Sequence, residues 1–229
     1  MWKRLSRVGW AGALGELALI VVGVLLALAA AEWQGRRSER GVERAVLAEM
    51  SEALSKDVEQ LQAGLDRFGR IEASTEIFLS HISSKSSYVD SLDAHFGAFY
   101  WISSANINLN SAAYESLKWQ GLRLISDQAL RSQIVQVYER SYARLQDSLD
   151  RERETVLEVL RPYFVLHFVD IKFGKTARPL DYAAMSNDAE FINLVAYRLE
   201  LLRANHITRF EDAIPELRGL LDEINVALR

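Results

Sequence analysis

The hydrophobic pattern divides the chain into one long apolar stretch and a longer region with helical periodicity. Residues 8–31 are apolar apart from the single charge of Glu16. As a helix they would rise about 36 Å at ~1.5 Å per residue, enough to cross a hydrocarbon core of about 30 Å. Trp10 and Trp33 bracket the stretch about 34 Å apart, as aromatic anchors at two membrane interfaces would. We therefore predict a transmembrane helix over residues 10–32.

A cleavable signal peptide is the alternative interpretation of this stretch. Ala29, Ala30 and Ala31 would offer the small-residue cleavage site that such a peptide needs. The apolar core of a signal peptide is shorter, however, and the helical pattern continues past residue 31 without a break. These two features favour an uncleaved span that contacts the lipid bilayer.

Small residues share one face of the predicted span with Glu16. At about 100° per residue, that face carries Gly9, Gly12, Glu16, Gly23, Ala27 and Ala30. Small residues let a second helix approach closely, which predicts a homo-oligomer or contacts with other membrane subunits. Because a carboxylate facing lipid is costly, two interpretations of Glu16 stay open. It reaches water or headgroups near the first interface, or it is a protonatable group between membrane helices.

The rest of the chain, residues 33–229, has the pattern of a helical domain. Apolar residues recur every three or four positions over residues 33–82, over residues 127–162 and after Asn187. The chain has only three prolines, which favours long helices over strands and turns. We predict an all-α fold, in which one N-terminal transmembrane helix is followed by an elongated antiparallel helical bundle.

Turn and cap residues mark the ends of several predicted helices. Gly121 suits the C-terminal end of a short helix over residues 112–120, and Ser126 is the expected N-cap of the next helix. Asn187 opens a sequence that resembles a capping box for the last helix. Residues 170–187 are expected to form the longest loop.

One short region is rich in aromatic residues and is the main candidate for a binding patch. It contains His95, Phe96, Phe99, Tyr100 and Trp101. These residues could simply pack beneath a long helix as part of the core. Alternatively they could line an amphipathic pocket for a ligand or partner, because aromatic rings near a histidine suit such a cavity.

Composition and motifs exclude several classes of protein. The formal net charge of −4 argues against a strongly basic nucleic-acid-binding protein. Cysteine is absent, so the chain has no disulfide framework or thiolate metal site. The sequence has no phosphate-binding glycine loop, zinc helix or nucleophile elbow, and its histidines lack the spacing of a di-iron bundle. Residues 151–154, a run of alternating charges, are expected to be solvated. We expect no cofactor, no metal and no catalytic residue, and hence no enzyme.

Basic residues flank the predicted span on both sides. In chain order they are Lys3, Arg4, Arg7, Arg36, Arg37, Arg40 and Arg44. Because the positive-inside rule counts both flanks, these charges alone leave the orientation open. A short basic tail ahead of a first span usually stays in the cytoplasm. We therefore expect the tail, residues 1–9, inside and the helical domain outside.

Two stretches of the sequence resemble an uncharacterised bacterial family of single-span membrane proteins. Residues 15–28, GELALIVVGVLLAL, are similar to that family's anchor, roughly G-E-I-x-L-x-x-x-G-I-x-x-A-L with a tryptophan soon after, as Trp33 is here. Residues 113–118 (AYESLK) and 121–127 (GLRLISD) are similar to its second signature. Residues 30–31 are alanines where the family has polar residues. Because the family carries a domain-of-unknown-function label, the resemblance implies an architecture and no reaction.

Two classes of function fit these features. The first is a membrane-anchored interaction or assembly protein that docks other subunits through its span and its bundle. The second is an extracytoplasmic ligand-sensing module that signals through a partner. A sensor needs a cytoplasmic output domain, and the short tail leaves no room for one, which favours assembly. We expect the protein in the bacterial inner membrane, with its N-terminus in the cytoplasm and its bundle in the periplasm.

Overall fold

The computed structural model describes residues 10–102 and 107–229, including the side chains from Gly15 onward. The chain divides into two compact units, Met1–Val46 and Leu47–Arg229. Helix α1, Trp10–Ser83, begins in the first unit and ends in the second. As the uninterrupted pattern predicted, it continues from the apolar stretch into the domain without a break.

The other described elements all belong to the second unit. They are α2 (Leu92–Phe99), α3 (Ala112–Gln120), η1 (Leu122–Leu124), α4 (Gln128–Gln136), η2 (Val137–Ser141), α5 (Tyr142–Glu154), η3 (Thr155–Leu160), α6 (Arg161–His167), β1 (Phe168–Lys172), β2 (Thr176–Pro179), α7 (Tyr182–Met185), α8 (Ala189–Leu201), η4 (Leu202–Ile207) and α9 (Thr208–Ala227). Segment η1 is a 3-10 turn, and η2, η3 and η4 are π-helical. Since β1 and β2 are the only strands among the described residues, the prediction of an all-α fold is confirmed.

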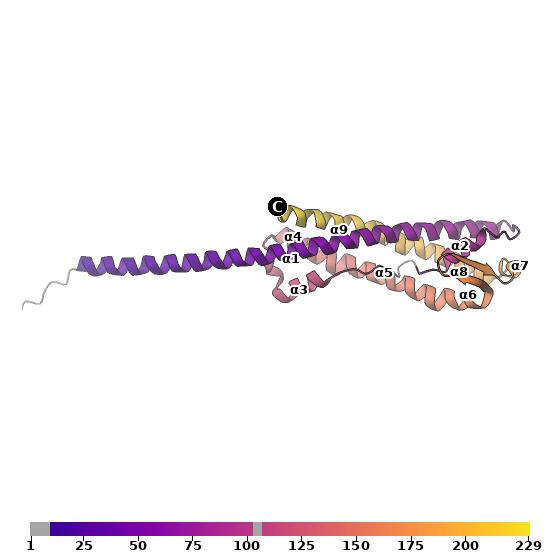
Figure 1. Ribbon diagram of the computed structural model, residues 1–229, viewed down its shortest axis with the longest axis horizontal. Helices are drawn as coiled ribbons and strands as arrows, with labels where there is room; N and C mark the ends of the chain where they lie inside the picture. Colours follow the sequence, from indigo (N-terminus) through magenta and orange to yellow (C-terminus); the bar gives the residue numbers. More distant parts are fainter. Residues whose placement is uncertain (1–9, 103–106) are drawn as a thin grey trace, which may run out of the picture. The chain divides into compact units, whose positions relative to one another are not determined.

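Helix α9 lies antiparallel to the part of α1 that belongs to the second unit (Figure 1). The Arg203 side chain donates from Nε to Glu72, at 2.6 Å, just before α9 begins. Near the other end of α9, Ser51 Oγ donates to Asn225 Oδ1 at 2.8 Å. The last helix therefore runs back along α1, as the predicted antiparallel bundle requires.

The helical run from α4 to α6 is parallel to α1. Tyr142 at the start of α5 donates to Asp57 in α1, whereas Phe164 in α6 belongs to the same core cluster as Phe78, further along α1. The described residues just before α3 lie beside an earlier part of α1 than α2 does. Among them, the Asn110 amide donates to Asp57 Oδ2 at 2.9 Å.

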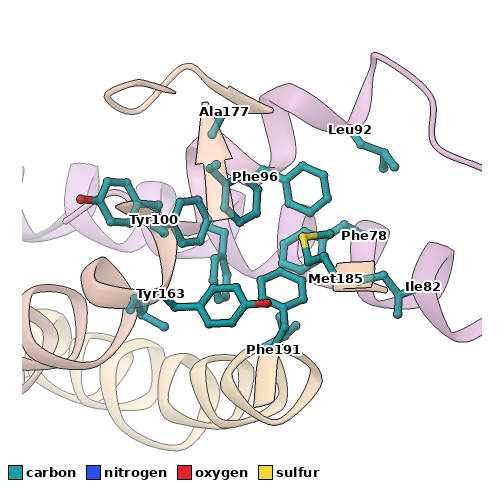
Figure 2. Packing of buried hydrophobic residues seen from close by; sticks show 14 of the residues in the cluster. Phe78, Ile82, Leu92, Phe96, Tyr100, Tyr163, Ala177, Met185 and Phe191 are labelled. Atoms are coloured by element: carbon teal, nitrogen blue, oxygen red, sulfur yellow. The ribbon is translucent and has the colours of Figure 1, made fainter. Parts of the chain in front are cut away.

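An aromatic core occupies the place where α1 meets α2, α6, α8 and the hairpin (Figure 2). Its centre is Phe191 of α8, which is fully buried. The ring centroid of Phe191 lies 5.2 Å from that of Tyr163 and 6.2 Å from that of Phe78. Edge and offset contacts of this kind add to the free energy of burying the rings themselves.

The segment after α6 is a β-hairpin, so the loop predicted for residues 170–187 was wrong. Strands β1 and β2 pair antiparallel, with Phe168 opposite Pro179, and Gly174 takes a positive φ of 67° at the turn. Phe168 and Ala177 are buried in the aromatic core. Glycine and proline marked this segment as irregular, but its pairing depends on packing against α2, which the sequence alone does not show.

Two helix N-caps lie one residue beyond the predicted ones. Asp127 rather than Ser126 caps α4, because its carboxylate accepts two amide hydrogens of the first turn at 2.7 and 3.2 Å. Likewise Asp188 rather than Asn187 caps α8, accepting an amide hydrogen at 2.9 Å. A carboxylate supplies both the acceptor and a negative charge that the positive end of the helix dipole favours.

Helix α2 packs so closely on the hairpin that Gly97 has no room for a side chain. A Cβ placed on Gly97 would lie 2.6 Å from the Thr176 Cα and 2.6 Å from the Lys175 carbonyl carbon. Glycine inside a helix costs roughly 0.5–1 kcal/mol relative to alanine. The close approach of two backbones explains why glycine is used here.

Gly97→Ala is expected to lower the free energy of unfolding by about 1–3 kcal/mol, because the methyl group overpacks the contact between α2 and β2. The control is Gly69→Ala in α1, where a Cβ meets nothing within 4 Å. Helix propensity predicts that this change raises stability by up to about 1 kcal/mol. Urea unfolding of the full chain in detergent micelles measures both variants. Equal midpoints would contradict the close contact.

Candidate functional site

The predicted membrane span is exposed along its whole described length. One described helix is long and apolar enough to cross a membrane, and no residue of its most apolar window is buried. Residues 15–42 are all exposed, including Glu16, Gly23, Ala27 and Ala30 of the predicted stripe. The tail of residues 1–9, including Gly9, lies outside the described residues, and the exposure of Trp10 and Gly12 is not described either.

Most of the predicted aromatic patch lies in the core (Figure 2). Phe96, Phe99 and Tyr100 are buried, and the Tyr100 ring stacks on Phe164 with centroids 4.5 Å apart. His95 is half-buried and Trp101 is 38% exposed. Three of the five side chains are therefore occupied by packing, and only His95 and Trp101 present surface to a partner.

A buried polar network in the second unit was not singled out by the sequence. Ser148 and Glu152 of α5 face Arg198 of α8 and His206 of η4, and all four side chains are fully buried. Arg198 binds Glu152 through two guanidinium nitrogens; the Nη2 to Oε1 distance is 2.6 Å. The charge run of residues 151–154 was expected to be solvated, and that expectation was wrong for Glu152.

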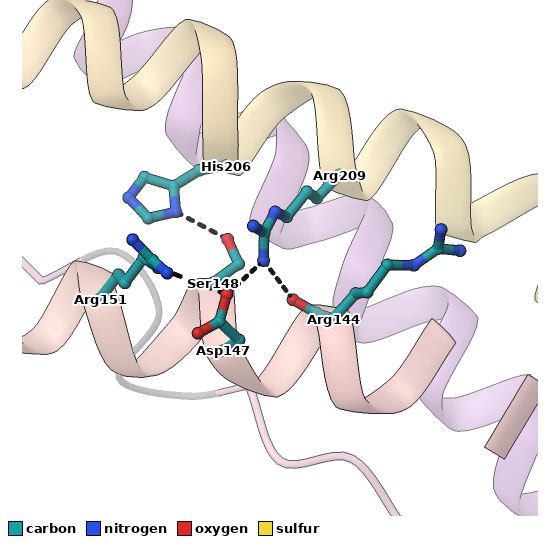
Figure 3. Close-up of polar contacts among 6 residues, drawn as sticks. All are labelled: Arg144, Asp147, Ser148, Arg151, His206 and Arg209. Atoms are coloured by element: carbon teal, nitrogen blue, oxygen red, sulfur yellow. Dashed lines mark hydrogen bonds and ion pairs between the residues drawn. The ribbon is translucent and has the colours of Figure 1, made fainter. Parts of the chain in front are cut away.

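His206 connects the two sides of this network. Its Nδ1 lies 2.7 Å from Ser148 Oγ (Figure 3), and its ring stacks on Phe68 with centroids 5.1 Å apart. Its Nε2 lies 3.3 Å from Glu152 Oε2. In the tautomer protonated on Nε2, Nδ1 accepts from Ser148. The Nε2–H then lies near the carboxylate but forms no hydrogen bond with it.

Burial lowers the pKa of His206 from 6.5 to about 4. The neighbouring Glu152 carboxylate acts in the opposite direction, and Arg198 offsets that carboxylate. Desolvation therefore decides the protonation state. His206 is neutral at pH 7, and its contact with Glu152 is not an ion pair.

The three residues Ser148, His206 and Glu152 resemble a nucleophile, base and acid in contact. Their surroundings do not suit that chemistry. Ser148 and His206 have no exposed surface for a substrate to reach, and Glu152 is bound to Arg198. No group of three or more metal-ligating side chains occurs within residues 15–102 and 107–229. The network instead fixes how α5 packs against α8 and η4.

Ion pairs at the surface connect α5 to α9 (Figure 3). Arg209 donates to Asp147 at 2.6 Å and to the Arg144 carbonyl oxygen at 3.0 Å. Arg151 lies 3.3 Å from the same carboxylate. The hydrogen bonds from Arg209 and Arg151 lower the pKa of Asp147. Because Asp147 and Arg151 are exposed and Arg209 is partly exposed, these pairs contribute little to stability.

A second buried carboxylate, Asp57 of α1, binds the residues just before α3. Asp57 accepts from Tyr142 Oη at 2.6 Å and from the Asn110 amide at 2.9 Å. Desolvation nevertheless raises the pKa of Asp57. The Tyr138 ring packs between those of Tyr142 and Tyr114, with both centroid distances 4.6 Å. This arrangement connects α3, η2 and α5 to α1.

No protein-family model, curated protein or solved structure matches the chain. What the protein does is therefore inferred from its own exposed and buried residues. The polar networks are buried, whereas no described residue covers the apolar part of α1.

Lowering the pH from 7 to 5 is expected to cost about 2 kcal/mol of stability through His206. Its folded pKa of about 4 lies below the ordinary 6.5. The unfolded chain therefore binds the proton first, and stability present above pH 6.5 is lost as the pH falls toward 4. Urea unfolding at several pH values measures this slope.

His206→Gln should flatten this pH dependence, because glutamine can hydrogen-bond to Ser148 but does not titrate. His167→Gln is the control, since His167 lies on an exposed face of α6. It should keep the wild-type slope. A slope unchanged in His206→Gln would show that other groups cause the pH dependence.

Proposed function

We propose that this protein is a membrane-anchored assembly protein of the bacterial inner membrane, which docks other subunits through its span and its helical domain. One observation carries the proposal: every residue of α1 from Gly15 to Val42 is exposed, and none of its most apolar described window is buried. An apolar surface of this extent belongs in lipid or against another protein. A helix satisfies its own backbone hydrogen bonds, so it can occupy a bilayer.

The small-residue stripe supports assembly through the span. Gly23, Ala27 and Ala30 would let the backbone of a neighbouring helix approach, and a Cβ on Gly23 meets nothing within 4 Å in this chain. Glu16 lies on the same face and would be shielded there. The neighbour in this proposal is a second copy of the chain or another membrane subunit.

The N-terminus lies in the cytoplasm and the domain in the periplasm, as a short basic tail before a first span favours. The protein is not an enzyme, a proposal supported by the sealed position of Ser148 and His206. The resemblance to the bacterial single-span family supports the same architecture.

Cysteine cross-linking in membranes tests the stripe. A cysteine at Ala27 should link to a neighbouring helix, whereas one at Leu25, on another face, should not. Gly23→Leu should abolish the link by adding bulk, and Glu16→Gln should preserve it, because polar contacts between membrane helices average only about 0.6 kcal/mol. Equal linking at both positions, or at neither, would contradict assembly through this face.

Reporter fusions at the C-terminus test the orientation. A reporter active only in the periplasm should give signal, and one active only in the cytoplasm should not. The opposite pattern would contradict the proposed topology and leave the span itself intact.

A further inference from the structure

A basic cluster follows the predicted span on one face of α1. Trp33, Arg36, Arg37 and Arg40 fall within an arc of about 100° at about 100° per residue. The four side chains line a single surface hollow. They all lie in the first unit, and all four are exposed.

Two of the arginines in the cluster contact a neighbouring side chain. The guanidinium carbon of Arg37 lies 5.4 Å from the centroid of the Trp33 ring, a cation–π distance. Arg36 pairs with Glu32 through one guanidinium nitrogen at 3.0 Å. Both side chains of that pair are more than 60% exposed, so the pair is weak and other N–H donors of Arg36 remain for a ligand.

The depth of these residues matches a layer of lipid headgroups. Along the helix, Arg36, Arg37 and Arg40 lie about 4.5, 6 and 10.5 Å beyond Trp33. The polar layer on each side of a bilayer is about 5–8 Å thick. With Trp33 at the interface, Arg36 and Arg37 are at the depth of the phosphates. Arg40 can reach back to them, since an arginine head extends several ångströms from its backbone.

We propose that Trp33, Arg36, Arg37 and Arg40 form a binding site for the phosphate headgroup of an anionic phospholipid in the adjacent leaflet. This inference rests on the proposed membrane span. Guanidinium groups bind phosphate oxygens through paired hydrogen bonds, and clusters of basic residues next to a span attract anionic lipids. The indole ring anchors the site at the level where apolar chains meet headgroups.

Lipid binding by the full chain in neutral detergent micelles tests the site. Native mass spectrometry can compare titrations with phosphatidylglycerol and phosphatidylcholine. The wild-type chain should bind phosphatidylglycerol about tenfold more tightly. The triple variant Arg36→Gln, Arg37→Gln, Arg40→Gln should lose this preference. Because the three side chains are exposed, the variant should keep the helical circular dichroism of the wild type.

The matched control removes an equal number of positive charges, three, from the second unit. Arg123, Arg140 and Arg153 are exposed, and their triple replacement by glutamine should leave the preference intact. Equal binding of both lipids by the wild type would overturn the site, as would a preference that survives in the Arg36, Arg37, Arg40 variant. Equal loss in both triple variants would overturn it as well, since net charge would then be the cause.

Two further measurements distinguish a lipid from a free phosphate ester as the ligand, and failure of the lipid site from failure of the span. Soluble glycerophosphate at millimolar concentration should not displace phosphatidylglycerol; displacement would identify a free phosphate ester as the ligand and overturn the lipid site. Alkaline carbonate extraction of membranes tests the span independently. A retained chain without lipid preference overturns only the lipid site, whereas an extracted chain overturns the proposed span and the lipid site together.

Discussion

Arg198→Met will lower the free energy of unfolding of the helical domain by about 3–5 kcal/mol. The guanidinium of Arg198 compensates the carboxylate of Glu152, and neither side chain has any exposed surface. Methionine fills a similar space but carries no charge, so the carboxylate stays buried without that compensation. Removing one member of a buried pair costs far more than the pair itself contributes, because an uncompensated charge remains in a medium of low dielectric constant.

Two further variants separate the charge from the packing. The double change Glu152→Leu, Arg198→Met removes both charges and should recover most of the loss, since apolar replacement of a buried pair is often neutral or stabilising. Arg203→Met is the surface control. Arg203 pairs with Glu72 and Glu76 at 43% exposure and should cost about 1 kcal/mol or less. Urea unfolding that gives equal losses for Arg198→Met and Arg203→Met would contradict the buried ion pair.

Phe191→Ala is expected to have an effect of similar size, a loss of about 3–5 kcal/mol. Phe191 is fully buried, and its ring contacts those of five aromatic neighbours. These neighbours are Phe78, Phe96, Phe99, Tyr163 and Phe168. These neighbours come from α1, α2, α6 and β1. The cavity that alanine would leave in place of the ring therefore cannot close without moving several elements. Both the lost burial and the remaining cavity contribute to the cost.

Phe173→Ala is the matched control for this prediction. Phe173 lies between β1 and β2 and is 64% exposed, although its ring contacts Tyr100 and Trp101. The same truncation there leaves no enclosed cavity and should cost about 1 kcal/mol or less. Thermal or urea unfolding of the two variants in the same micelles provides the comparison. Similar losses would show that Phe191 does not organise the core.

Either core variant also bears on the proposed assembly. The lipid site and the small-residue stripe lie in the first unit, whereas Phe191 and Arg198 lie in the second. A destabilised domain should therefore leave cross-linking at Ala27 intact if the span alone drives assembly. Loss of that cross-link in Phe191→Ala would show that the helical domain contributes to docking.

The sequence by itself predicted the helical architecture. Apolar residues at intervals of three and four predicted the uninterrupted α1 and the long helical runs that begin with α4 and α8. The run from α4 continues past its predicted end at Pro162 to His167. The prediction of the helices worked because a helix forms its backbone hydrogen bonds locally, so that its pattern can be read from one segment. Gly121 marked the end of α3 for the same reason, and its φ is positive, at 99°.

The tertiary structure decided which polar residues are buried and which segments pair. Glu152 belongs to a charged run in which Arg151 and Arg153 are exposed. It is buried because Arg198, which is far away in the sequence, forms an ion pair with it. The β-hairpin likewise packs against α2, whose backbone comes so close to Thr176 that only glycine fits at position 97. Both outcomes depend on contacts between residues far apart in the chain. The periodicity of one segment does not reveal such contacts, because they contribute to the free energy of folding only once the elements pack together.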